Sequence, residues 1–204
     1  LYHGDRLLLP VYPLSPDDPA KVQEYMGYVV HETSRLTRML TEVMEFSRPV
    51  RVKREVQPLN PVVERAVHVV KQQVPEEVTL TLTLDPELPS LLLDSGSVEQ
   101  VVINLVRNAV EAVGEQGKVQ VQTRVWNGGA AIVVEDDGPG IPEETQARIF
   151  EPFFTTKRQG NGLGLPICRE IVAEHGGHIL LNSTPGRGAS FTVTLEAEGA
   201  NGNP

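Results

Sequence analysis

Residues 94–113 read DSGSVEQVVINLVRNAVEAV, and the predicted fold depends most on this stretch. Asp94 or Ser95 can cap the start of a helix. The apolar residues that follow recur every three or four positions, as on the buried face of an amphipathic helix. They are Val98, Val102, Leu105, Val106, Ala109 and Val113. Asn104 and Asn108 are four positions apart, so both amides project from one side of this helix, flanked by core positions.

The two asparagines allow two interpretations. A buried amide needs a hydrogen-bonding partner, and its oxygen is a neutral, hard ligand that suits Mg2+ when the ion also binds substrate phosphates. The alternative is a pair of solvated side chains on an ordinary amphipathic helix. Taken alone, the helix favours the solvated pair.

A second polar motif follows an apolar strand, where residues 131–142 read AIVVEDDGPGIP. A carboxylate at a strand end, such as Asp136, can accept a hydrogen bond from an exocyclic amine like that of adenine. Gly138 and Gly140 would let the backbone pass close to a flat ring. The alternative is an acidic turn without a ligand, because Asp, Gly and Pro all favour turns.

A third motif is rich in glycine, with FEPFFTTKRQGNGLGLP at residues 150–166. Gly160, Gly162 and Gly164 alternate in a loop that leads into a helix, where backbone N–H groups can face phosphate oxygens. Lys157 and Arg158 add two cations just before it. The spacing matches neither a P-loop nor a Rossmann fingerprint. The pattern predicts a mobile lid over a phosphate-containing ligand.

The residues around these motifs predict an α+β domain over residues 55–197, with helices covering one face of a mixed sheet. Upstream, residues 20–50 predict a helix whose narrow apolar stripe suits packing on other helices. Residues 1–19 contain four prolines and predict an irregular segment. The Gly- and Asn-rich residues 198–204 predict a disordered tail. The other expected helices span about 60–73, 143–149 and 164–174, and the strands 79–86, 91–94, 118–126, 130–135, 178–184 and 189–195.

Composition excludes several functional classes. The formal net charge of the 204 residues is -9, which argues against nucleic acid as a partner. Cys168 is the single cysteine and cannot form an internal disulfide, which fits a reducing, cytoplasmic compartment. No apolar run approaches ~18 residues, so no membrane contact is expected within the chain. The chain lacks an initiator Met and is interpreted as a fragment of a longer protein, whose membrane attachment is left open.

Taken in order, the motifs resemble the histidine-kinase branch of the ATPase superfamily that includes gyrase, Hsp90 and MutL. NLVRNAVEA is similar to that family's N box, and Asp136, Gly138 and Gly140 match the D-x-G-x-G of its first glycine box. FEPFFTTK resembles the F box, GNGLGL the second glycine box and PGRGASFTVTL the last strand pair. The resemblance covers residues 58–197 and is nearest to the nitrogen-regulation type of sensor kinase.

The resemblance implies the superfamily's α/β sandwich and a site for ATP and Mg2+. It makes Asn108 the Mg2+ ligand, places Asn104 beside the phosphates and lets Asp136 hold the adenine amine, directly or through water. Lys157 would approach the triphosphate. The residues that shape the pocket and lid would be Gly138, Gly140, Gly160, Gly162, Leu163 and Gly164. The implied reaction is transfer of the ATP γ-phosphoryl to a histidine and on to an aspartate of a response-regulator receiver domain, in a homodimer formed through the N-terminal helix.

The phosphoacceptor stays unknown at this point. Residues 24–49 resemble the second helix of the family's dimerisation hairpin, whereas the acceptor normally lies on the first helix, in a motif like H-E-x-x-[NR]-P. His31-Glu32 imitates the motif, but Leu36 stands where proline is expected. The acceptor is therefore expected outside this chain. Two alternatives remain: a nucleotide-binding and dimerisation module without kinase activity, and another ATPase or a serine kinase of the superfamily.

Overall fold

The computed structural model describes residues 2–3, 6–7, 21–30, 33–34, 37, 52–157 and 160–197. The chain divides into two compact units, Leu1–Met44 and Glu45–Pro204. Among the described residues, no helix is both long and apolar enough to cross a lipid bilayer.

The N-terminal unit contains helical residues within the predicted helix. Residues 21–30 are helical, as are 33–34 and 37. Met26, Val29 and Val30 expose more than half of their surface. The rest of the predicted helix over 20–50, including His31, lies outside the described residues, as does the predicted tail at 198–204.

The prediction that residues 1–19 are irregular is wrong at two places. The strands β1 (Tyr2–His3) and β2 (Arg6–Leu7) pair in antiparallel fashion. The prediction rested on prolines, and the first of these is Pro10, which follows both strands. Proline limits the residues beside it and does not oppose pairing farther upstream.

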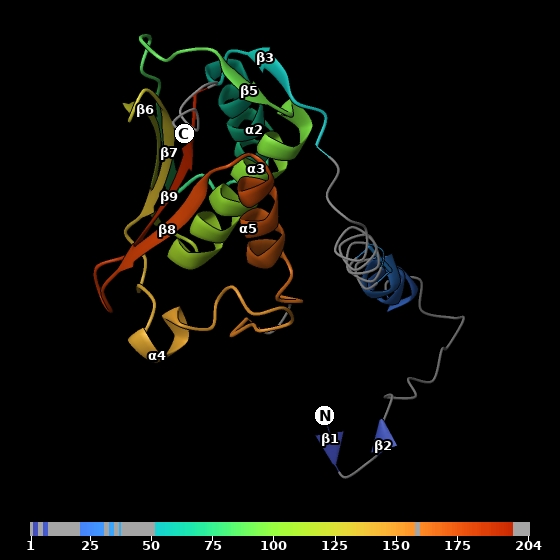
Figure 1. The fold of residues 1–204 in the computed structure, drawn as a ribbon. Helices are drawn as coiled ribbons and strands as arrows, with labels where there is room; N and C mark the ends of the chain where they lie inside the picture. Colours follow the sequence, from blue (N-terminus) through green and yellow to red (C-terminus); the bar gives the residue numbers. More distant parts are fainter. Residues whose placement is uncertain are drawn as a thin grey trace. The chain divides into compact units, whose positions relative to one another are not determined.

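The larger unit is an α/β sandwich, which confirms the predicted fold class. Its five-stranded sheet has the order β4-β6-β7-β9-β8. The pair β4 and β6 is parallel and the other pairs are antiparallel, so the sheet is mixed. Helices α2, α3 and α5 lie together on one face of it (Figure 1). The bounds are β4 Val78–Thr83, β6 Gly117–Trp126, β7 Gly129–Asp136, β8 His178–Ser183, β9 Ala189–Leu195, α2 Asn60–Lys71, α3 Ser95–Val113 and α5 Gly164–Glu174.

The core lies between the helices and the sheet. On α3, Leu105 and Val106 are fully buried, and Val121 and Ile132 on the facing strands are also fully buried. Burying a side chain of this size contributes about 1.5–3 kcal/mol. The apolar residues predicted for one face of α3 are therefore the ones that pack in this core. Asn104 and Asn108 lie at the margin of this face and are only partly buried.

A small second sheet was not predicted in full. The strand β3 (Glu55–Gln57) pairs antiparallel with β5 (Leu91–Leu93), and Val56 faces Leu92. Three residues are too few to display a strand's alternation in the sequence. The partner strand is also more than thirty positions away, so this pairing depends on tertiary contacts.

The start of α3 is held from three directions. Asp94 Oδ1 accepts a hydrogen bond from Ser97 N at 2.9 Å, which is the N-cap interaction, and Asp94 Oδ2 accepts one from Lys53 N at 2.8 Å. Asp94 N donates to Nε2 of His175 at 2.9 Å. Burial alone would raise the pKa of Asp94, but the N–H groups of Ser97 and Lys53 outweigh burial, so that the pKa is lowered.

Candidate functional site

Asn104 lies between α3 and α5. A Cβ placed on Gly164, the first residue of α5, would lie 3.8–3.9 Å from the Asn104 side chain. Burial raises the pKa of Cys168, one turn farther along α5, to about 12, although a hydrogen bond with the Asn104 side chain opposes the shift. The thiol is therefore neutral at physiological pH. The Asn104 amide lies next to the first turns of α5.

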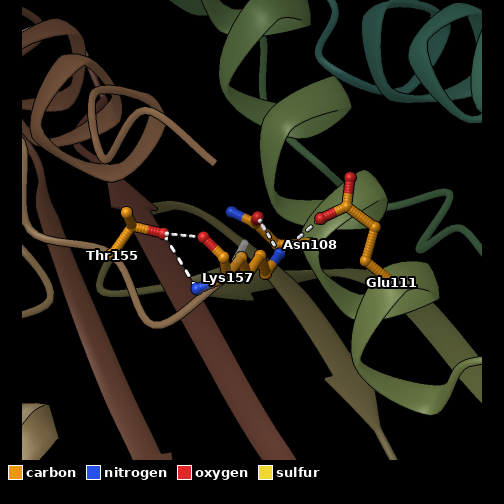
Figure 2. A network of polar contacts seen from close by, with 4 residues as sticks. All are labelled: Asn108, Glu111, Thr155 and Lys157. Carbon is orange, nitrogen blue, oxygen red and sulfur yellow. Dashed lines mark hydrogen bonds and ion pairs between the residues drawn. The ribbon is translucent and has the colours of Figure 1, made fainter. Parts of the chain in front are cut away.

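Asn108 lies one turn farther along α3 and contacts Lys157 (Figure 2). Lys157 Nζ donates to Asn108 Oδ1 at 2.8 Å and forms an ion pair with Glu111 Oε2 at 2.5 Å. The backbone of Lys157 is braced by Thr155, whose Oγ1 accepts a hydrogen bond from Lys157 N at 3.1 Å. The structure thus brings together two predicted residues, Asn108 and Lys157, with one that was not predicted.

Glu111 was not predicted, because it belongs neither to the asparagine pair nor to the phosphate-binding cations. A signal was available, since Glu111 is three positions after Asn108 and residues at this spacing are neighbours on a helix surface. The sequence does not show that Lys157, 46 positions after Glu111, contacts this glutamate.

Asp136 ends β7 and is 6% exposed. Its Oδ1 accepts a hydrogen bond from Gly138 N at 2.9 Å. Burial raises the pKa of Asp136, and the nearby acids Asp137 and Glu135 add to the shift, while N–H groups of Gly138 and Ala189 oppose it. A buried carboxylate in this setting would be stabilised by a further N–H donor, such as the amine of a purine.

The two glycines after Asp136 are required by the protein itself. A Cβ on Gly138 would lie 2.8 Å from Asp136 Oδ1 and 3.1 Å from the Ala112 carbonyl oxygen, at the last turn of α3. Gly140 has φ +71°, and a Cβ there would overlap the carbonyl oxygen of Thr184. The turn therefore packs closely against α3 and the β8–β9 connection, which holds the Asp136 carboxylate beside the C-terminal half of α3.

The glycine-rich loop closes on the F-box segment. Phe153 N donates to the carbonyl oxygen of Gly162 at 3.0 Å, and Gly162 has φ +70°. A Cβ on Gly160 would lie 2.7 Å from Thr155 Oγ1, so this glycine lies close to the residues that brace Lys157. The predicted cation Arg158 lies outside the described residues.

The loop ends at α5, whose start carries no capping side chain. Leu163 is fully buried in the core and its N–H donates to Asn161 Oδ1 at 3.1 Å. Because the Leu163 side chain faces the core, only its backbone is placed to contact a ligand. The N–H groups of an uncapped first turn are a favourable environment for an anion such as phosphate.

Comparison with known families decides the identity of this unit. Residues 93–199 match the family model described as "Histidine kinase-, DNA gyrase B-, and HSP90-like ATPase". The chain belongs to this ATPase family. Its relatives include AtoS, a signal transduction histidine-protein kinase of Escherichia coli that is 38% identical over 85% of this chain, and NtrB, a sensory histidine kinase/phosphatase of Klebsiella oxytoca that is 34% identical over 87% of it.

The chain spans only 29% of the length of AtoS and 53% of that of NtrB. Among solved structures, full-length ShkA in complex with AMPPNP matches with a TM-score of 0.76 and 25% identity, over 86% of this chain and 39% of ShkA. The kinase ThkA in complex with the response regulator TrrA matches with a TM-score of 0.73 and 32% identity, over 88% of this chain and 52% of ThkA. The resemblance to sensor histidine kinases, first inferred from the motifs, is confirmed.

In this ATPase-family unit several of the predicted residues lie at or near the C-terminal half of α3. Asn104 faces the start of α5, Asn108 contacts Lys157, and Gly138 places the turn after Asp136 against Ala112. The chemistry of Asn108 fits a divalent cation, because its amide oxygen already faces a positive group, the Lys157 ammonium, at 2.8 Å.

Proposed function

We propose that this chain is the ATP-binding catalytic part of a sensor histidine kinase. The parent protein would transfer the γ-phosphoryl of ATP to a histidine and from there to an aspartate of a receiver domain. The observation that carries the proposal is the grouping of a buried acceptor, Asp136, an amide oxygen, Asn108, and a cation, Lys157, around the C-terminal half of α3. This grouping matches the chemistry of a purine nucleoside triphosphate, with Asp136 for the base, Asn108 for the metal ion and Lys157 for the phosphates.

Each residue would have a distinct role in binding. Asp136 would accept a hydrogen bond from the adenine amine, for which its buried position is suited. Asn108 would hold Mg2+, which when bound neutralises charge on the triphosphate. Lys157 and the first-turn N–H groups of α5 would contact phosphate oxygens, with Asn104 beside them. Catalysis would consist mainly of positioning and charge stabilisation.

The partners follow from the same proposal. A receiver domain would accept the phosphoryl group, and the ThkA–TrrA complex supports that class of partner. The apolar side chains exposed on residues 21–30 are suited to packing against other helices in a homodimer. We place the acceptor histidine outside residues 52–197. Within that range His175 is unavailable, because it is buried with both ring nitrogens hydrogen-bonded, Nε2 to Asp94 N and Nδ1 to Ile171 O.

Incubation of the chain with γ-labelled radioactive ATP tests the proposal. Label that is lost in acid and retained in alkali, on this chain or on an added histidine-containing helical module, supports histidine phosphorylation. Acid-stable label on serine would instead indicate a serine kinase of the family. Nucleotide binding with no label on either polypeptide would favour a binding and dimerisation module. A His31→Gln variant separates labelling of His31 from labelling elsewhere.

A further inference from the structure

Glu111 forms an ion pair with Lys157. Among the described residues, Lys157 is the one cation of the glycine-rich loop. Glu111 Oε2 pairs with Lys157 Nζ at 2.5 Å, and the same ammonium donates to Asn108 Oδ1 at 2.8 Å (Figure 2). The two acceptors are one helical turn apart on α3, so together they form a small oxygen-lined cradle for a positive charge. Glu111 and Lys157 are both about half exposed, at 48% and 41%.

The cradle competes with the role proposed for Asn108 and Lys157. An amide oxygen that binds a divalent cation cannot keep an ammonium at hydrogen-bonding distance without strong repulsion between the two positive charges. Lys157 can likewise reach a phosphate only by giving up at least part of its contact with α3. Binding of a nucleotide is therefore linked to separation of Lys157 from Glu111.

We propose that Glu111 is a positioning residue that restrains Lys157 on α3 and thereby sets how readily the ammonium moves to the nucleotide phosphates. This inference rests on the proposed function, since it assumes that the ligand carries phosphates. The backbone of Lys157 is held separately, because its N–H donates to Thr155 Oγ1, and a Cβ on Gly160 would lie 3.3 Å from the Lys157 Cβ.

Two other roles for Glu111 give different results. A surface ion pair with no link to the ligand would affect stability slightly and leave nucleotide affinity unchanged. A carboxylate that bound Mg2+ directly would strengthen nucleotide binding only when the metal is present. A restraint on Lys157 weakens nucleotide binding with and without metal, and it does so only while Lys157 carries its charge.

The experiment measures the dissociation constant of ATP by calorimetry, in MgCl2 and in EDTA, for the wild-type chain, Glu111→Gln, Lys157→Gln and the double variant. Glu111→Gln is expected to tighten ATP binding about two- to fivefold in both buffers, the range expected from loss of a partly exposed ion pair. Lys157→Gln should weaken binding. In the Lys157→Gln background, the gain from Glu111→Gln should fall to less than half of its value.

A matched control comes from the same helix. Glu99 pairs with Arg65 at 3.2 Å, away from Lys157, so Glu99→Gln removes a comparable ion pair and should leave ATP affinity unchanged. A gain that persists in full without Lys157 would overturn the inference, because Glu111 would then act directly by repelling phosphate. An unchanged affinity, or weakening confined to MgCl2, would also overturn it. Should wild type bind no ATP in either buffer, the proposed function fails and this inference with it.

Discussion

The two ends of α3 use polar side chains in opposite ways. At the N-terminal end, Asp94 accepts hydrogen bonds from the backbone N–H groups of Ser97 and Lys53, and its own N–H donates to the buried His175. At the C-terminal half, Asn108 and Glu111 share a partner, Lys157, whose long side chain comes from a loop. Backbone partners keep their places, whereas a lysine ammonium can exchange one acceptor for another. The first end therefore holds the fold together, and the second is the end proposed to contact the nucleotide.

Replacing Asn108 by Ala gives the largest expected effect and tests the ligand-binding end. The change removes the amide oxygen that faces Lys157 and that is proposed to hold Mg2+. We expect Mg-dependent ATP turnover to fall by about 100-fold or more, as when a preorganised polar group is removed from an active site. Thermal unfolding should change little, because the side chain is only partly buried. Calorimetry of Mg-ATP binding that matched wild type would contradict the assignment of the pocket.

Replacing Asp136 by Ala tests recognition of the purine. The wild-type carboxylate is expected to favour adenine, whose amine can donate to it, over guanine, which presents a carbonyl there. A hydrogen bond to a charged group contributes about 1.5–3 kcal/mol, which corresponds to roughly 10- to 100-fold in affinity. The ratio of the dissociation constants of GTP and ATP should therefore fall toward one in the variant. A ratio that stayed at the wild-type value would place the adenine elsewhere.

Replacing Asp94 by Ala tests the structural end. Loss of the N-cap should lower the free energy of unfolding by about 1 kcal/mol at pH 7, with ATP affinity unchanged. Because the pKa of Asp94 is lowered in the folded state, its contribution is present above the unfolded value of 3.8 and is lost as the pH falls through the folded pKa. Urea denaturation should therefore show wild type and variant converging in strong acid. Equal stabilities at pH 7 would argue against the cap.

Replacing Asp136 by Asn gives the smallest expected effect and sharpens the contrast with Asp94. The folded-state pKa of Asp136 is raised by burial, so its charged form is destabilised by folding at neutral pH. The neutral amide should raise the free energy of unfolding at pH 7 by up to about 1 kcal/mol, as often happens when a functional group is removed. This gain should disappear as the pH falls through the raised pKa to 3.8 and below. Denaturation at pH 7 showing the variant to be less stable would contradict it.

The elements of the larger unit were mostly predictable because their signals are local. The period of apolar residues predicts α3 to within a residue of its observed bounds, and Asn127-Gly128 marks the turn between β6 and β7. Pairing of β3 with β5 was not predictable, since it joins short segments far apart in the chain. His175 illustrates the same limit, because its position at the end of α5 indicates a turn residue, while its bond to Asp94 spans 81 positions.

The family, most helices and strands of the larger unit and the motifs that supply Asn108, Asp136 and Lys157 can be inferred from the sequence alone. These depend on residue types at short spacings, where periodicity and backbone preference act directly. Which side chains meet depends on the tertiary structure, in which Lys157 contacts both Asn108 and Glu111 and the turn after Asp136 lies against Ala112. Such contacts depend on how the sheet and helices pack, and packing brings together residues whose separation along the chain carries no information about their distance in space.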